Sequence, residues 1–206
     1  MNDKFFDLVK EKQDKIINAA LKIFAKSDYR RSSTDEIVKE AGISKGLLFH
    51  YFNSKAGLFD FIYAYSVKYL SIELYQTISI KETDYFELIE QIVNAHLRIM
   101  RQYPYMILFL KKAEEEEEEE VVSFISKKRQ DYRQEYSRIF ARADMSGFKK
   151  DIKIEMAQNI IAFTMKGIED MYLKKSKFIP EELSQSTIDY LKILKPFMYE
   201  LTRYSG

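Results

Sequence analysis

Residues 33–52, STDEIVKEAGISKGLLFHYF, carry two short helical patterns on either side of Gly42. Ser33 is followed three residues later by Glu36, which is the pattern of a capping box: the hydroxyl accepts a hydrogen bond from a free amide of the first turn, and the carboxylate reaches back to the cap. The pattern predicts a helix over residues 34–40, with Ile37 and Ala41 inward. Gly42 then ends the helix as a left-handed C-terminal cap.

The second pattern begins at Ser44, which caps a helix predicted over residues 45–51. At about 100° per residue, Leu48 and Phe52 share the side expected to pack inward. The opposite side presents a bare backbone and an imidazole with two apolar neighbours: Gly46, His50, Leu47 and Phe49. A glycine inside a helix lowers its stability by about 1 kcal/mol relative to alanine. Close approach of another molecule to the bare backbone at Gly46 would compensate for that loss. Free amides at the helix start favour phosphate, and DNA is the candidate.

A helix predicted over residues 3–26 precedes these two, because apolar residues recur at a helical period from Ile16 to Phe24. Three helices with a short glycine turn between the last two form a helix-turn-helix head. Both cap serines would be present without DNA, so the prediction of DNA contact depends on the whole set of residues at this spacing. The first 58 residues hold 11 basic and 8 acidic side chains, which is a weak additional sign of a phosphate partner.

The rest of the chain continues in helical periods, and the fold is predicted to be all-α with about nine helices. We expect a DNA-binding domain over residues 1–55 and a helical domain over residues 56–206. The further helices are predicted over residues 55–78, 85–103, 105–112, 114–143, 151–173 and 180–204. The glutamate run 114–120 is expected to be solvated, to open the helix that follows and to stay clear of DNA, with cation binding as the alternative.

Composition excludes several kinds of site. The chain has no cysteine, which rules out disulfides, thiolate nucleophiles and sulfur-rich metal sites. Its two histidines are isolated, and it has neither a phosphate-binding glycine loop nor an HExxH pattern, so no enzyme activity, cofactor or metal is expected. The longest apolar run, residues 105–110, is far shorter than the roughly 20 residues that span a bilayer. We therefore expect a cytoplasmic protein with no membrane partner.

The run SSTDEIVKEAGISKGLLFHYFNSKAGLF resembles the N-terminal domain of TetR-type transcriptional regulators, over about residues 10–60. The resemblance implies that Ser33 and Thr34 contact phosphate at the start of the first short helix. It also implies groove or backbone contacts by Ser44, Lys45 and Gly46, base-edge contacts by Leu47 and His50, and phosphate contacts by Tyr51 and Lys55. Phe49 departs from the family, which usually has tyrosine there, so Phe49 is expected to touch a thymine methyl or simply to pack.

The resemblance further implies a homodimer on a palindromic operator. Two wide apolar faces, in residues 151–173 and 180–204, independently suit a four-helix interface, although they could instead cover the core of their own subunit. The candidate interface residues are Ile161, Thr164, Gly167, Ile168, Met171, Leu191, Leu194, Phe197, Met198 and Leu201.

By the same resemblance, the central helices surround a cavity for a mainly apolar or aromatic effector. The candidate lining residues are Tyr65, Tyr69, Phe86, His96, Met100, Tyr103, Met106 and Phe109. Each could instead be an ordinary core residue, and His96 a satisfied core histidine. The expected function is a ligand-responsive DNA-binding regulator, by family default a repressor. The alternatives are a regulator of this fold without an effector, or an activator; a purely structural helical module leaves the helix-turn-helix residues unexplained.

Overall fold

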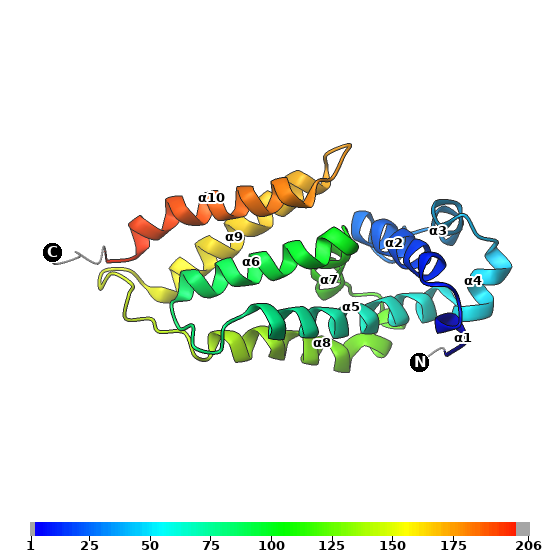
Figure 1. The fold of residues 1–206 in the computed structure, drawn as a ribbon, viewed down its shortest axis with the longest axis horizontal. Helices are drawn as coiled ribbons and strands as arrows, with labels where there is room; N and C mark the ends of the chain where they lie inside the picture. Colours follow the sequence, from blue (N-terminus) through cyan, green and yellow to red (C-terminus); the bar gives the residue numbers. More distant parts are fainter. Residues whose placement is uncertain (1–2, 201–206) are drawn as a thin grey trace. The chain divides into compact units, whose positions relative to one another are not determined.

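The computed structural model describes residues 3–200, and this part of the chain forms ten α-helices and no strand (Figure 1). The helices are α1 (Asp3–Phe6), α2 (Lys10–Lys26), α3 (Thr34–Ala41), α4 (Lys45–Phe52), α5 (Lys55–Thr77), α6 (Tyr85–Gln102), α7 (Met106–Glu114), α8 (Glu119–Phe140), α9 (Ile154–Leu173) and α10 (Pro180–Met198). The all-α prediction is confirmed. Within residues 3–200 no helix has the length and apolar character that crossing a membrane requires.

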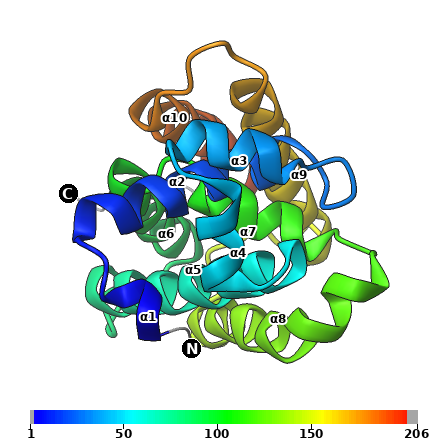
Figure 2. The same cartoon turned by 90° about the vertical axis from the view of Figure 1, so that its right-hand side faces the viewer.

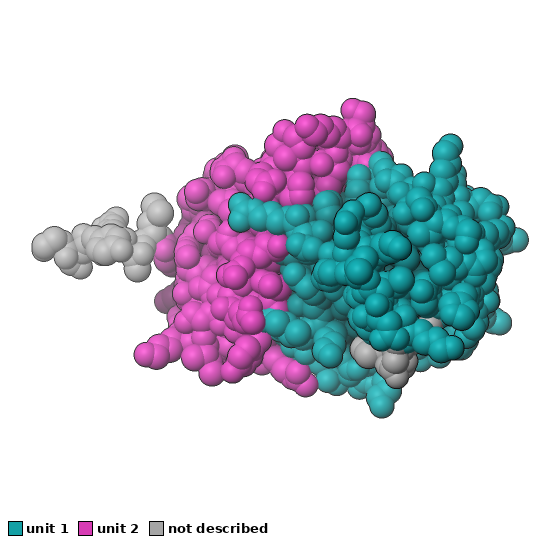
Figure 3. Space-filling model, turned by 45° about the vertical axis from the view of Figure 1, so that its right-hand side comes forward, with its two compact units in different colours: residues 1–72, 99–135 teal, residues 73–98, 136–206 magenta. Residues whose placement is uncertain are grey.

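The chain divides into two compact units (Figure 3). The first contains Met1–Ile72 and Ile99–Glu135, and the second contains Glu73–Arg98 and Tyr136–Gly206, of which residues up to 200 are described. The expected boundary near residue 55 thus falls inside the first unit. α2, α3 and α4 form the helix-turn-helix in this unit, and α2 packs against both α3 and α7 (Figure 2).

Aromatic side chains form much of the first unit's core. Phe24 lies 4.9 Å from Phe59 and 6.1 Å from Phe109 between ring centroids, and Phe59 lies 5.1 Å from Phe109. These contacts join α2, α5 and α7. Burying a phenylalanine stabilises a fold by about 1.5–3 kcal/mol, so this cluster is a main support of the head.

The second unit has its own core, built from α6, α9 and α10. Its buried residues are Tyr85, Phe86, Ile89, Val93, Phe148, Ala157, Ile161, Leu191, Met198 and Tyr199. The segment between α8 and α9 is held to the end of α10 by two backbone hydrogen bonds, from Lys149 N to Met198 O (2.9 Å) and from Glu200 N to Gly147 O (3.0 Å).

The single first helix predicted over residues 3–26 is wrong, because the chain breaks between Phe6 and Lys10. The buried Gln13 side chain explains the break. Its Nε2 donates to the carbonyl oxygens of Phe6 (3.1 Å) and Leu8 (2.7 Å). The side chain thus takes the place of the backbone amides that would bond to these carbonyls in a continuous helix. The break also lets Phe5 turn into the core, where it is fully buried.

The glutamate run does not open a helix as one block. α7 ends at Glu114, residues 115–118 form a connection, and α8 begins at Glu119. α10 contains Pro196 in its last turn and ends at Met198, where the Tyr199 amide donates to Lys195 O. The predicted extension beyond residue 200 and the interface candidate Leu201 lie outside the described residues.

Candidate nucleic-acid interface

The turn between α3 and α4 has the two serine caps and the left-handed glycine that its sequence predicts. Asp35 N donates to Ser33 Oγ (3.2 Å), and Leu47 N donates to Ser44 Oγ (3.2 Å), so both serines cap their helices. Gly42 adopts φ +67° and ψ +38°, and the amide of the next residue, Ile43, bonds to Val38 O at 3.1 Å. The left-handed glycine therefore closes α3 and directs the chain into α4.

α4 has one buried side and one open side. Leu48 is 1% exposed and Phe52 is 4% exposed, whereas Gly46 and His50 are exposed and Leu47 and Phe49 are half-buried. A Cβ added to Gly46 would meet nothing within 4 Å. The predicted orientation of the helix is confirmed, and the backbone at Gly46 is free for another molecule to approach.

Tyr51 does not share this open side. Its ring is 9% exposed and lies edge-on to Phe5, with centroids 5.9 Å apart and an interplanar angle of 80°. Phe52 and Phe61 pack against the same Phe5 ring, at 5.3 and 4.9 Å. The body of Tyr51 is therefore part of the head's core, and only its edge is available to a ligand.

The two lysines proposed as phosphate contacts have partners within the chain. Lys45 Nζ forms an ion pair with Asp35 at 2.8 Å, and both side chains are largely exposed. Lys55 Nζ lies 4.3 Å from the centroid of the Tyr29 ring and donates to Arg30 O at 3.5 Å. Burial lowers the pKa of Lys55, and the nearby Glu120 carboxylate partly offsets that effect.

Two glutamates of the run 114–120 bond to the head at the turn between α2 and α3. Tyr29 N donates to Glu116 Oε2 at 2.8 Å, and Tyr29 OH donates to Glu120 Oε2 at 3.0 Å. Glu116 and Glu120 thus hold the turn between α2 and α3, next to Lys55. Sequence patterns miss this contact because it joins residues 87 and 91 positions apart.

Three residues that follow α4 were not singled out as a structural set. Asn53 has φ +61° and ψ −44°, and Ser54 N donates to Phe52 O at 2.7 Å, which closes a γ-turn. Ser54 Oγ accepts from Gly57 N at 2.9 Å and caps α5. A Cβ at Gly57 would lie 2.2 Å from Phe52 O, so the close crossing of α4 and α5 requires glycine. The NSKAG sequence contains the signal, a cap serine three residues before a glycine amide.

The comparisons with known proteins agree with this geometry. Residues 16–62, which include the whole helix-turn-helix, match the family model for bacterial regulatory proteins of the tetR family. Residues 16–62 therefore form a TetR-type DNA-binding head. Its head is 50% identical over 50 residues to YuxN, an HTH-type transcriptional regulator of Bacillus subtilis. That match covers 24% of this chain and only 17% of YuxN.

Solved TetR-family structures share the fold along most of the chain. A TetR family transcriptional regulator from Chloroflexus aurantiacus has a TM-score of 0.61 at 18% identity, with 97% of this chain and 98% of that chain covered. PfmR from Thermus thermophilus has a TM-score of 0.57 at 18% identity, covering 88% and 97%. The fatty acid degradation regulator FadR from Bacillus halodurans has a TM-score of 0.56 at 20% identity, covering 86% and 96%.

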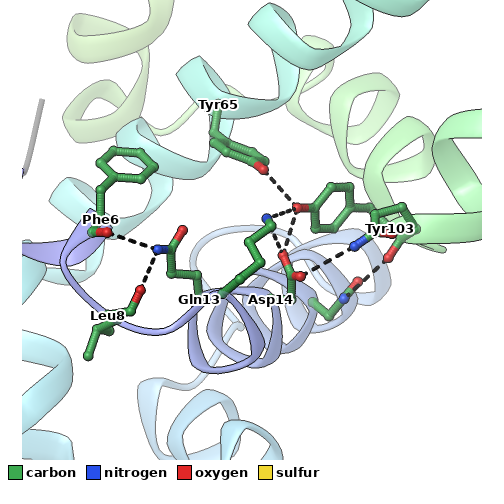
Figure 4. A network of polar contacts seen from close by, with 9 residues as sticks. Phe6, Leu8, Gln13, Asp14, Tyr65 and Tyr103 are labelled. Carbon is green, nitrogen blue, oxygen red and sulfur yellow. Dashed lines mark hydrogen bonds and ion pairs between the residues drawn. The ribbon is translucent and has the colours of Figure 1, made fainter.

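A polar network in the first unit ties α2 of the TetR-type head to α5 and to the residue after α6 (Figure 4). The fully buried Tyr103 is the centre of the network. Its hydroxyl donates to Asp14 Oδ1 at 2.7 Å and accepts from Lys10 Nζ at 2.9 Å. It also lies 2.7 Å from Tyr65 OH. Lys10 and Asp14 also form an ion pair at 2.6 Å. Burial, followed by the hydrogen bonds to Tyr65 and Asp14, raises the pKa of Tyr103 well above its usual range.

We expect Tyr103→Phe to lower the free energy of unfolding by about 1–3 kcal/mol, because it removes the hydroxyl that bonds to Asp14, Lys10 and Tyr65. Denaturant titration measures the loss. Tyr75→Phe is the matched control, since Tyr75 is 89% exposed and its hydroxyl should matter by less than about 0.5 kcal/mol. Equal stability of Tyr103→Phe and the wild-type chain would contradict a stabilising role for the network.

The same variant has a pH signature. The pKa of Tyr103 is raised in the folded chain, so its contribution is complete below the unfolded value near 10 and is lost as pH rises above it. The stability difference between wild type and Tyr103→Phe should therefore stay constant from about pH 7 to 9 and shrink by about 1.4 kcal/mol per pH unit above about pH 10.

The candidate effector residues lie in both units. Phe86 packs edge-on against Tyr199 (4.9 Å) in the second unit, where His96 Nε2 also lies 2.8 Å from Tyr136 OH, as expected of a satisfied core histidine. The others lie in the first unit: Tyr65, Tyr69, Met100, Tyr103, Met106 and Phe109. Met100, Tyr103, Met106 and Phe109 are buried, whereas Tyr65 and Tyr69 are partly open.

The candidate dimer residues separate into two sets. Ile161, Ile168, Leu191 and Met198 are buried within the chain itself, so their side chains offer little surface to a partner. Gly167, Met171 and Phe197 are exposed, and Thr164 and Leu194 are half-buried. The pattern of apolar residues could not separate the two sets, because both faces of α9 and α10 are apolar.

Proposed function

We propose that this chain is a ligand-responsive, DNA-binding transcriptional regulator that binds a palindromic operator as a homodimer and acts in the cytoplasm as a repressor. The observation that carries the proposal is the open side of α4, where Gly46 leaves the backbone uncovered between Ser44 at the helix start and His50 one turn further on. A helix of this kind enters the major groove with its first residues nearest the bases.

The expected contacts follow from the chemistry of each residue. The free amides at the start of α4, together with Lys45, suit a phosphate, and Ser33 and Thr34 offer the same at the start of α3. Leu47 and His50 would reach base edges, and Phe49 a thymine methyl. Lys45 would exchange Asp35 for a phosphate, and Lys55 would reach one from beside Tyr29. Binding should therefore weaken as salt rises.

The support for a dimer is an exposed apolar stripe on α9 and α10, which lie side by side in the second unit (Figure 1). On α9 it consists of Ile160, Phe163, Gly167 and Met171, and on α10 of Tyr190, Ile193 and Phe197. The spacing places each set on one side of its helix. Continuous exposed apolar surface of this kind marks an interaction site, and a Cβ at Gly167 would meet nothing within 4 Å, which allows a partner helix to approach closely.

Two heads joined in this way would read half-sites about 34–36 Å apart on DNA. A small, mainly apolar or aromatic effector would release the operator by changing the position of the heads, through α5 and through the Tyr103 network that holds α2. Coupling of about 1–3 kcal/mol would change operator affinity roughly 5- to 150-fold. Footprinting on the DNA that flanks the gene for this chain, followed by operator titration with and without a candidate ligand, tests both parts. If the affinity for the operator is the same with and without every ligand tested, the chain is a regulator without an effector.

A further inference from the structure

The first unit contains a groove of about 880 Å³ beside α4, within the size range of small-molecule sites. Its walls come from the end of α4, one side of α5, α8 and α1, which can be followed in Figure 2. Its lining includes Lys4, His50, Phe61, Ala64, Tyr65 and Lys128. All the lining residues belong to the first unit. Of the eight residues predicted to line an effector cavity, Tyr65 alone is among them, so the groove is distinct from the expected cavity.

One wall of the groove is aromatic. Phe61 and Tyr65 are stacked, with ring centroids 6.2 Å apart and an interplanar angle of 24°, and both are only half-buried. Ala64 lies between them on the same stretch of α5 and contributes little bulk. A planar ring can pack against such a surface, because offset stacked and edge-to-face arrangements are both favourable.

The charges of the groove favour an anion. Lys128 Nζ is paired with Asp60 at 2.5 Å, which neutralises the acidic residue of the lining. Lys4 is exposed and forms no ion pair with any side chain from residue 4 to residue 200. His50 adds a second donor at the mouth, on the exposed side of α4. One cation therefore remains uncompensated beside the aromatic wall.

We propose that this groove binds a small planar aromatic anion, such as an aromatic carboxylate. Its ring lies against Phe61 and Tyr65, and its acid group faces Lys4 and His50. The occupant would touch the head at two points: directly at α4, and at Tyr65, whose hydroxyl joins the Tyr103 network that holds α2. The effect on DNA rests on the proposed function, whereas binding in the groove does not.

The test is a fluorescence titration of the full chain with 8-anilinonaphthalene-1-sulfonate, an aromatic anion that brightens when bound. We expect saturable binding that weakens about tenfold in Lys4→Glu and is lost from the groove in Ala64→Leu, which fills it. Lys12→Glu is the matched control, because Lys12 is exposed on α2 and outside the groove, and it should bind as the wild-type chain does. Circular dichroism confirms that each variant is folded.

Equal affinity of the dye for Lys4→Glu and Lys12→Glu would mean that it binds elsewhere, for example on the α9 and α10 stripe, and would overturn the proposal. An absence of saturable binding would also overturn it. Because these measurements contain no DNA, a negative result leaves the proposed function untouched. Conversely, groove binding by a chain that shows no DNA preference would support the groove and remove only the regulatory consequence.

Discussion

Replacing Gly46 with leucine is expected to lower affinity for the specific duplex by at least about 100-fold while leaving the fold intact. The side chain would project from the open side of α4, where the structure places nothing within 4 Å of an added Cβ. It would therefore meet the DNA backbone or base edges and nothing else. Gly46→Ala should even raise the free energy of unfolding, by up to about 1 kcal/mol, because alanine is the better helix former.

Gly57→Ala is the matched control for Gly46→Ala, because it makes the same chemical change eleven residues away with the opposite structural result. Its Cβ would lie 2.2 Å from the carbonyl oxygen of Phe52, which is backbone and cannot move cheaply. We expect this variant to lose about 1–3 kcal/mol of stability. Anisotropy with a labelled duplex and denaturant titration measure the two quantities separately. Full DNA affinity in folded Gly46→Leu would mean that α4 presents another side to the groove.

Introducing aspartate at both Phe163 and Phe197 is expected to convert the protein to monomers. These rings are 72% and 70% exposed, and in a dimer they would lie at the centre of the α9 and α10 stripe. Buried unpaired carboxylates are costly, so the interface should not survive two per subunit. Sedimentation velocity measures the change. Specific DNA affinity should fall with it by about 10²–10⁴-fold, the usual advantage of two linked binding sites.

Phe124→Asp is the control for the dimer variant, because Phe124 is 52% exposed on α8, outside the stripe. It should leave the sedimentation coefficient and the DNA affinity unchanged. A dimer that persists in the Phe163→Asp, Phe197→Asp protein would move the interface away from α9 and α10. Loss of the dimer in Phe124→Asp would have the same consequence.

The head was predictable because its information is local. Ser33, Gly42 and Ser44 each act on residues within five positions, so capping rules give the helix boundaries and the orientation of α4 directly. The break before α2 was missed because it depends on Gln13 bonding to carbonyl groups outside its helix. Periodicity counts apolar residues and does not see that competition.

Long-range contacts limited the rest. Two sets of hydrogen bonds join segments some 90 residues apart: those of Glu116 and Glu120 to Tyr29, and that of Tyr103 to Asp14. Nothing in either segment alone specifies the pairing. The dimer stripe posed a different problem. Ile160 and Ile161 are adjacent and chemically identical, yet the first is exposed and the second is in the core. Only the packing of α9 against α6 and α10 separates them.

The central claim, that α4 reads a specific duplex, is tested most directly by competition binding with the wild-type chain. A labelled duplex from the flank of its gene is titrated against excess random duplex between about 50 and 200 mM salt. The expected result is a preference of about 10³ or more, with an affinity that falls linearly on logarithmic axes as salt rises. Equal displacement by random and flanking duplexes, from folded protein, would contradict the claim.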